Sequence, residues 1–118
     1  MKITIGGELP DLNTIIDKSK KHWAAYSKMK KTHTNRVAWV AKSELEPMKK
    51  IDLHFKWYCK NRRKDKDNII VGQKFIIDGL VEAGILENDG WKQIGDIKHS
   101  FEVDKEEPRV EVEIKEVD

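Results

Sequence analysis

A chain of 118 residues, 38% of them hydrophobic and 37% charged, can build one hydrophobic core but not two, so we predict a single domain over residues 1–118. Its only cysteine, Cys59, excludes an internal disulfide, and the chain has neither an apolar run long enough to cross a membrane nor the apolar core of a signal peptide. We therefore expect a cytoplasmic protein without a membrane partner.

The net charge of +2 hides an asymmetry along the chain. Residues 1–66 contain 17 Lys and Arg and 7 Asp and Glu, a formal charge of +10, whereas residues 67–118 contain 6 and 14, a formal charge of −8. A basic half beside an acidic half indicates a polyanion partner, such as a nucleic acid, held by one region. The alternative is that both signs are mixed on the folded surface.

The first half of the chain is predicted to contain a short strand, a helical region and a longer strand. Residues 2–5, KITI, form the first strand, and the glycines and proline that follow end it. Residues 14–45 predict either two helices or one helix with a loop, because residues 32–35, THTN, are poor helix formers. Residues 51–58, IDLHFKWY, alternate apolar and polar side chains and predict a half-buried strand.

The second half is predicted to contain one helix and two strands. Residues 67–83 have a wide apolar face of helical spacing, and Gly84 stands where a helix-ending glycine belongs. Residues 91–103 predict a strand in which Gly95 marks a bulge, and residues 109–117, RVEVEIKEV, alternate as a strand does. The order β-α-β-α-β-β favours an α+β fold, with a small mixed or antiparallel sheet and helices packed on it.

Two groups of side chains bear on a nucleic-acid partner. The helical region carries seven cations that form a basic surface suited to phosphate contacts. They are Lys18, Lys20, Lys21, Lys28, Lys30, Lys31 and Arg36. The four tryptophans are expected in the core, with base stacking by Trp23 or Trp39 as the alternative.

Two aspartates lie two residues apart in the stretch that follows the predicted strand at 51–58. In extended backbone Asp65 and Asp67 point the same way, about 6.6 Å apart along the chain, so their carboxylates can flank a Mg²⁺ ion. Asp89, from a distant turn, would complete a site in which the metal polarises a phosphate and lowers the pKa of an attacking water. Each aspartate alone has a structural alternative: Asp67 caps a helix, Asp65 offsets Lys64, and Asp89 belongs to a turn.

Cations lie on both sides of these aspartates. A basic run before them can hold phosphates. Its members are Lys60, Arg62, Arg63 and Lys64. Lys74 follows on the predicted helix, where a lysine can stabilise a charged transition state. The alternative is an exposed helix lysine that pairs with Asp78, four residues later.

The chain offers little for other chemistries. Its four histidines show no metal-ligand spacing, and it has no phosphate-binding loop, dinucleotide fingerprint or nucleophile elbow. We therefore expect no small-molecule substrate.

The stretch RRKDKDN, followed by a helix ending DGLVEAG and then by LEND, resembles the RusA family of Holliday-junction resolvases, common in phages and prophages. The family pattern is a basic run, D-x-D-N, a helix carrying a lysine, D-[AG]-L-x-x-A-G and a terminal aspartate. The matching residues are Arg62, Arg63, Asp65, Asp67, Asn68, Lys74, Asp78, Gly79, Leu80, Ala83, Gly84 and Asp89. Compared with the enterobacterial form, the segment between D-x-D and D-G-L carries about three extra residues, close to one helical turn.

The resemblance implies a dimeric, Mg²⁺-dependent endonuclease, with Mn²⁺ as an alternative ion, that binds four-way DNA junctions and nicks two strands of like polarity symmetrically. It implies that the essential aspartates are Asp65, Asp67 and Asp89 and that the important lysine is Lys74. A homodimer agrees with the near two-fold symmetry of a junction, because it presents two identical sites.

The sequence therefore predicts a RusA-like junction resolvase of a bacterial or phage-infected cell, acting in recombination, repair or phage DNA processing. In this hypothesis the three aspartates bind Mg²⁺ and act in catalysis with Lys74, and the basic run at residues 60–64 holds the DNA. Three alternatives stay open: a non-catalytic DNA-binding module, a metal-dependent nuclease for other branched DNA or RNA, and an interaction protein without a nucleic-acid partner.

Overall fold

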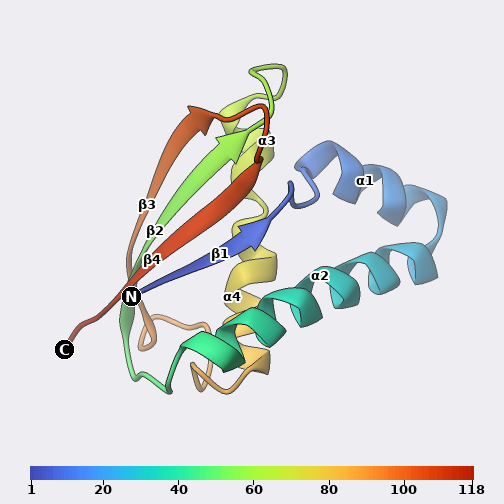
Figure 1. Ribbon diagram of the computed structural model, residues 1–118. Coiled ribbons are helices and arrows are strands. Elements are labelled where there is room, and N and C mark those ends of the chain that lie inside the picture. The colour runs from blue at the N-terminus through green and yellow to red at the C-terminus, as the bar shows by residue number, and fades with distance from the viewer.

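Four strands form one mixed sheet in the computed structural model, which describes residues 1–118 (Figure 1). They are β1 (Lys2–Gly6), β2 (Ile51–Cys59), β3 (Ile94–Val103) and β4 (Arg109–Glu116). The strand order is β1-β4-β2-β3, with β2 and β3 parallel and the other two pairs antiparallel. The predicted α+β fold with a mixed sheet is confirmed.

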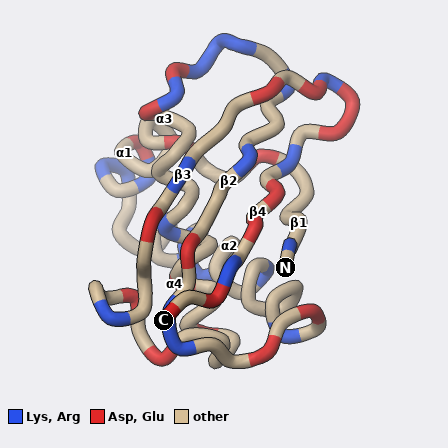
Figure 2. The backbone as a smooth tube through the Cα atoms, turned by 90° about the vertical axis from the view of Figure 1, so that its left-hand side faces the viewer, with Lys and Arg blue, Asp and Glu red and all other residues tan.

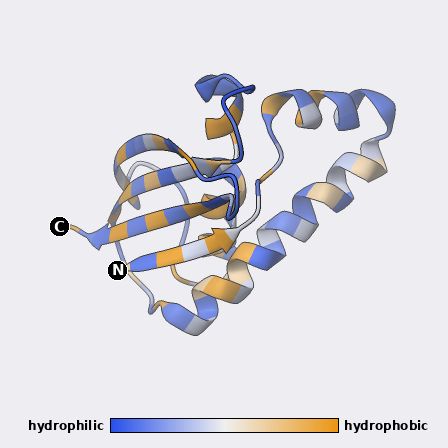
Figure 3. Cartoon of the chain, turned by 45° about the horizontal axis from the view of Figure 1, so that its top comes forward, coloured by the Kyte–Doolittle hydropathy of each residue, from blue (hydrophilic) through white to orange (hydrophobic).

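One face of the sheet is buried because apolar residues occupy alternate positions along its strands. In β2 every second residue from Ile51 to Cys59 is buried, and Val110, Val112 and Ile114 follow the same rule in β4. These side chains belong to a hydrophobic core of 21 residues, and the alternation along the strands is visible in Figure 3. The polar residues between them lie on the opposite face, which no helix covers (Figure 1).

Four helices lie on the buried side of the sheet, although the first of them has no buried residue and packs mainly on the second and third. These helices are α1 (Leu12–Lys21), α2 (Trp23–Glu44), α3 (Lys66–Ile70) and α4 (Gln73–Glu82), and none has the length and apolar character that spanning a membrane requires. The extended backbone of His22 ends α1, and its Nδ1 accepts the Ala24 N–H at the start of α2. The break expected at residues 32–35 is therefore in the wrong place. Those residues are helical because α2 buries Val37 and Ala41 in the core, and such packing overrides weak propensity.

The helix predicted over residues 67–83 is present as two segments, because α3 and α4 are separated at Val71 and Gly72. Both residues keep α-helical backbone angles, so the interruption is slight. A Cβ on Gly72 would lie 3.1 Å from the Trp57 ring, so close packing accounts for the glycine. Gly84 adopts φ +77° directly after the last helical turn, as predicted for a helix-ending glycine.

The connection from β2 to β3 positions the predicted site. Because these strands are parallel, the chain that leaves β2 must return to the opposite end of the sheet, and α3 and α4 make that crossover. The D-x-D stretch therefore follows the carboxyl end of β2, whereas Asp89 precedes the amino end of β3. The register between β2 and β3 shifts where Ile51 pairs with Ile94 and Leu53 with Ile97, so β3 has one extra residue in the span that contains Gly95, the position of the predicted bulge.

The tryptophans are distributed differently from the expectation. Trp57 is buried, but Trp23, Trp39 and Trp91 are 79%, 80% and 95% exposed. The prediction that the tryptophans belong to the core is therefore wrong for three of the four.

Candidate functional site

The loop between β2 and α3 carries the basic run, visible as the blue segments beyond the end of β2 in Figure 2. Ion pairs anchor part of it: Lys64 Nζ lies 3.1 Å from Asp11 Oδ2, and both Lys60 and Lys64 approach Glu8 Oε1, at 3.9 and 3.8 Å. Burial alone would raise the pKa of Asp11, but hydrogen bonds from Thr14 and Lys64 outweigh it and hold that pKa below its ordinary value. Lys60 and Lys64 therefore tie the loop to the residues that precede α1.

Arg62 and Arg63 differ from these lysines. Both are exposed, and no carboxylate lies within ion-pairing distance of either guanidinium. A guanidinium without a partner can bind a phosphate without first breaking an ion pair. The basic run thus contains two cations that hold the fold and two that are available to a ligand.

The two aspartates of the D-x-D stretch are exposed and lack the structural roles that would explain them. Asp65 is the N-cap residue of α3, yet its side chain makes no capping hydrogen bond. Asp67 lies in the first helical turn, and Lys64 pairs elsewhere, so neither carboxylate has an ion pair. Asn68 does have a structural role, because its Oδ1 accepts the Asn13 N–H at 3.1 Å and so joins α3 to α1.

Lys74 links Asp78 on its own helix to Asp89 in the loop before β3. Its Nζ lies 3.1 Å from Asp78 Oδ1 and 3.4 Å from Asp89 Oδ2. The hydrogen bond to Asp78, opposed by burial and aided by Asp89, raises the pKa of Lys74, so the side chain is a cation at neutral pH. Asp78 Oδ2 lies 3.9 Å from Lys30 Nζ on α2, and the four residues form a chain of alternating charge.

The three predicted metal ligands have suitable chemistry but are not assembled into a metal centre. Carboxylates are the hard oxygen ligands that Mg²⁺ prefers, and two of the three are exposed and unpaired. However, no group of three or more His, Cys, Asp or Glu side chains is arranged to hold a metal ion. Asp65 and Asp89 line different cavities, and Lys74 engages the Asp89 carboxylate. The structure thus brings Lys74 to Asp89 but does not gather Asp65, Asp67 and Asp89.

A groove between α2 and α4, of about 510 Å³, reaches this charged chain. Its lining residues on α2 are Ser27, Lys30, Lys31, Thr34 and Asn35. On the other side it is lined by Asp78 and Glu82 of α4 and by Asp89. The sequence pattern placed Lys30 and Lys31 on a basic surface but missed the three polar residues. Together with the two lysines they recur at intervals of three and four residues, which puts all five on one helix face, and this spacing was the available signal.

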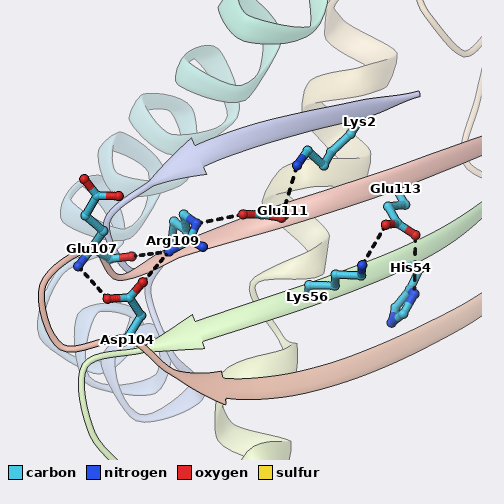
Figure 4. Close-up of polar contacts among 8 residues, drawn as sticks. All are labelled: Lys2, His54, Lys56, Asp104, Glu107, Arg109, Glu111 and Glu113. Carbon is cyan, nitrogen blue, oxygen red and sulfur yellow. Dashed lines mark hydrogen bonds and ion pairs between the residues drawn. The ribbon is translucent and has the colours of Figure 1, made fainter.

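The uncovered face of the sheet carries many charges, and several of them form ion pairs with one another (Figure 4). Arg109 lies 2.8 Å from both Asp104 and Glu111, and Lys56 lies 2.7 Å from Glu113. The hydrogen bond to Arg109 is the main reason that the pKa of Glu111 lies below its ordinary value. Arg109, Lys56 and Lys2 on this face are therefore paired, whereas Lys98 and Lys115 are exposed and form no ion pair.

The loop after β2 thus combines unpaired arginines, which can bind phosphates, with two free carboxylates, which can bind a hard metal ion. Residues 9–115 match the model of a protein family described as Endodeoxyribonuclease RusA. The chain therefore belongs to the RusA family of endodeoxyribonucleases, and the resemblance found in its motifs is confirmed. A search among curated proteins finds no significant match.

Proposed function

We propose that the protein is a metal-dependent endonuclease that resolves four-way DNA junctions by paired, symmetric nicks. Membership of an endodeoxyribonuclease family supports the cleavage of DNA. One observation carries the choice of site: Asp65 and Asp67 are exposed carboxylates without a cap or ion pair, and they adjoin the unpaired cations Arg62 and Arg63. Charged groups that the fold leaves without partners are available to a substrate and its counter-ion.

Asp65, Asp67 and Asp89 are the proposed ligands of a divalent ion, Mg²⁺ with Mn²⁺ as an alternative, which polarises phosphate oxygens when bound. Because the Lys74 ammonium contacts Asp89, an ion that uses this carboxylate competes with Lys74 for it. Asp78 gives Lys74 a second contact, so the lysine stays beside Asp89 and can stabilise negative charge on a phosphate.

The basic run is the proposed DNA contact. Arg62 and Arg63 are free to bind the strand directly, whereas Lys60 and Lys64 contribute from positions fixed by Glu8. Such contacts go to the phosphate backbone, so they favour recognition of DNA shape over sequence.

A homodimer is the proposed working form. A four-way junction has near two-fold symmetry, and a C₂ dimer presents two identical sites to strands of like polarity, whereas one chain of this size offers only one. We place the activity in the cytoplasm of a bacterial or phage-infected cell, in recombination, repair or phage DNA processing.

The test is cleavage of a labelled four-way junction in Mg²⁺ and in chelator, by the wild type and by Asp67→Asn. Paired symmetric nicks that require both the ion and Asp67 would establish the proposal. Asp17→Asn is the matched control, because this exposed aspartate on α1 pairs only with Lys21, and it should nick at the wild-type rate. Equal nicking by Asp67→Asn would refute the site.

One observation favours a second candidate, a non-catalytic module that binds branched DNA: the Asp89 carboxylate is already paired with Lys74, and no three-carboxylate cluster is formed. This candidate predicts tight junction binding without nicks in any divalent ion. A nuclease that cut flaps or RNA with no preference for four-way junctions would contradict both candidates.

A further inference from the structure

The α2 side of the groove between α2 and α4 presents a row of hydrogen-bond donors. Ser27, Lys31 and Asn35 follow one another at intervals of four residues, and Lys30 and Thr34 lie between them on the same helix face. The row spans eight residue steps, which is about 12 Å of helix. That length corresponds to three or four nucleotides of one DNA strand, at roughly 3.4 Å of axial rise each.

Three members of this row, Ser27, Lys31 and Asn35, are available to a ligand, whereas the Thr34 hydroxyl oxygen is buried. Lys31 is exposed and has no ion pair, unlike Lys30, whose Nζ lies 3.9 Å from Asp78. The hydroxyls of Ser19 and Thr32 donate to carbonyl oxygens of their own helices, but no such bond engages Ser27. Ser27 and Asn35 are both exposed, so their polar groups face solvent.

The two walls of the groove have opposite character. The α2 wall is cationic and polar, and the wall formed by α4 and the following loop carries Asp78, Glu82 and Asp89. A phosphate backbone in the groove is attracted to the first wall and repelled by the second, so a strand must lie along α2. Asp89, paired with Lys74, stands on the opposite wall, facing the strand.

We propose that the α2 wall, defined by Ser27, Lys30, Lys31, Thr34 and Asn35, is a binding track for the phosphate backbone of the DNA strand that passes Asp89. The inference rests on the proposed function, because it assumes a DNA substrate. It adds a contact surface on α2, separate from the basic run at residues 60–64. Backbone contacts of this kind are independent of sequence and sensitive to salt.

The test compares Lys31→Gln with Lys42→Gln, an identical change at an exposed residue of the same helix outside the groove. Binding to a labelled four-way junction is measured in chelator across a series of salt concentrations. Loss of one phosphate contact lowers the slope of log affinity against log salt by about 0.9, and the affinity at 0.15 M salt roughly fivefold. We expect this for Lys31→Gln and no change for Lys42→Gln.

A second variant tests the α2 wall by adding a negative charge to it. Asn35→Asp places a carboxylate among the donors and should weaken binding more than Lys31→Gln does. Its melting temperature should stay close to that of the wild type, because Asn35 is exposed. Equal salt slopes for the wild type, Lys31→Gln and Lys42→Gln would overturn the track.

The two proposals fail separately. If the wild type nicks junctions and Lys31→Gln binds and cuts as the wild type does, the track is wrong and the nuclease proposal stands. If the wild type binds but never nicks and Lys31→Gln still lowers the slope, the track stands and the nuclease proposal is wrong. If the wild type did not bind DNA, both proposals would be wrong.

Discussion

The uncovered face of the sheet and the loop after β2 are both rich in charged residues, but their arginines differ in whether they have a carboxylate partner. On the sheet face, Arg109 lies between Asp104 and Glu111 at 2.8 Å, and its guanidinium also lies over the Tyr58 ring, 3.9 Å from the centroid. In the loop, Arg62 and Arg63 have no carboxylate partner. Composition cannot distinguish these arginines, because only the fold decides which of them meets a partner.

The difference separates charges that hold the fold from charges that are free for a ligand. A paired cation must lose its carboxylate before it binds a phosphate, so it contributes little net attraction. An unpaired cation releases the counterions of a phosphate at no such cost. The basic character of the first half of the chain therefore overstates its DNA-binding surface, and the unpaired members define it more closely.

The largest effect is expected from replacing the two free arginines of the loop. Arg62→Gln combined with Arg63→Gln removes two phosphate contacts, which lowers junction affinity roughly 30-fold at 0.15 M salt and the salt slope by about 1.8. Thermal unfolding should be unchanged, because neither side chain has a partner in the fold. Fluorescence anisotropy with a labelled junction measures the affinity.

The matched control is Arg109→Gln, the same change on the sheet face. It leaves Asp104 and Glu111 without their shared cation, so the melting temperature should fall by a few degrees while junction affinity stays at the wild-type value. If Arg109→Gln weakened binding as much as the double change in the loop, the distinction between paired and free charge would be wrong.

A second prediction concerns the packing that forms the groove. A Cβ on Gly79 would lie 2.5 Å from Val37 Cγ1 and 3.1 Å from the Thr34 carbonyl oxygen, both on α2. Gly79→Ala should therefore push α2 and α4 apart and destabilise the fold by about 1–3 kcal/mol, measured by denaturant unfolding. Gly6→Ala is the control, because no atom lies within 4 Å of the added Cβ.

The cause can be checked with a compensating change. Val37→Ala in the Gly79→Ala background removes the nearest clashing atom, Val37 Cγ1, but leaves Val37 Cβ 2.6 Å from the added methyl group. It should therefore recover only part of the lost stability, even though Val37→Ala alone destabilises a buried site. If the double variant were less stable than the wild type by the full sum of the two single effects, direct overpacking would not be the mechanism.

The elements that could be predicted from the sequence are those with local causes. The alternation in IDLHFKWY and RVEVEIKEV predicts strands of a sheet with one covered face, and Gly84 predicts a helix end. Both could be predicted because each signal depends only on neighbouring residues. The break at His22 could not be predicted, since it depends on one extended residue whose ring accepts the next helix's N–H. The exposure of Trp39 was equally hidden, because α2 buries Val37 and Ala38 instead.

The candidate site also has a part that could be predicted from the sequence and a part that could not. Asp65 and Asp67 follow β2 after a loop of five residues, and only Asp65 has the expected extended backbone, whereas Asp67 lies in the first turn of α3. The partners of Lys74 depend on the parallel pairing of β2 with β3. That pairing separates the D-x-D stretch from the loop that holds Asp89, and no local pattern encodes it. The ligand roles of Asp65, Asp67 and Asp89 thus remain predictions, whereas the contact between Lys74 and Asp89 is a finding that spacing alone did not give.

The smallest effect is expected from pH, and it extends the comparison to the two faces of the sheet. On the covered face, burial is the main cause that lowers the pKa of His99, with a further contribution from His54, and its Nδ1 accepts the Trp57 Nε1–H at 2.9 Å. On the uncovered face, ion pairs lower the pKa values of Glu111 and Glu113.

Because of these pKa shifts, the stabilising contributions of the two faces are lost in different pH ranges. The unfolded chain protonates His99 near its ordinary pKa of about 6.5 while the folded chain resists, so stability is full above that pH and falls below it. The carboxylates hold their contribution down to their ordinary pKa of about 4.5 and lose it at lower pH. Melting temperature should thus decline in two stages, and His99→Gln, which cannot titrate, should diminish the first and leave the second. A wild-type melting temperature that is constant from pH 7 to pH 5 would show that His99 does not couple to folding.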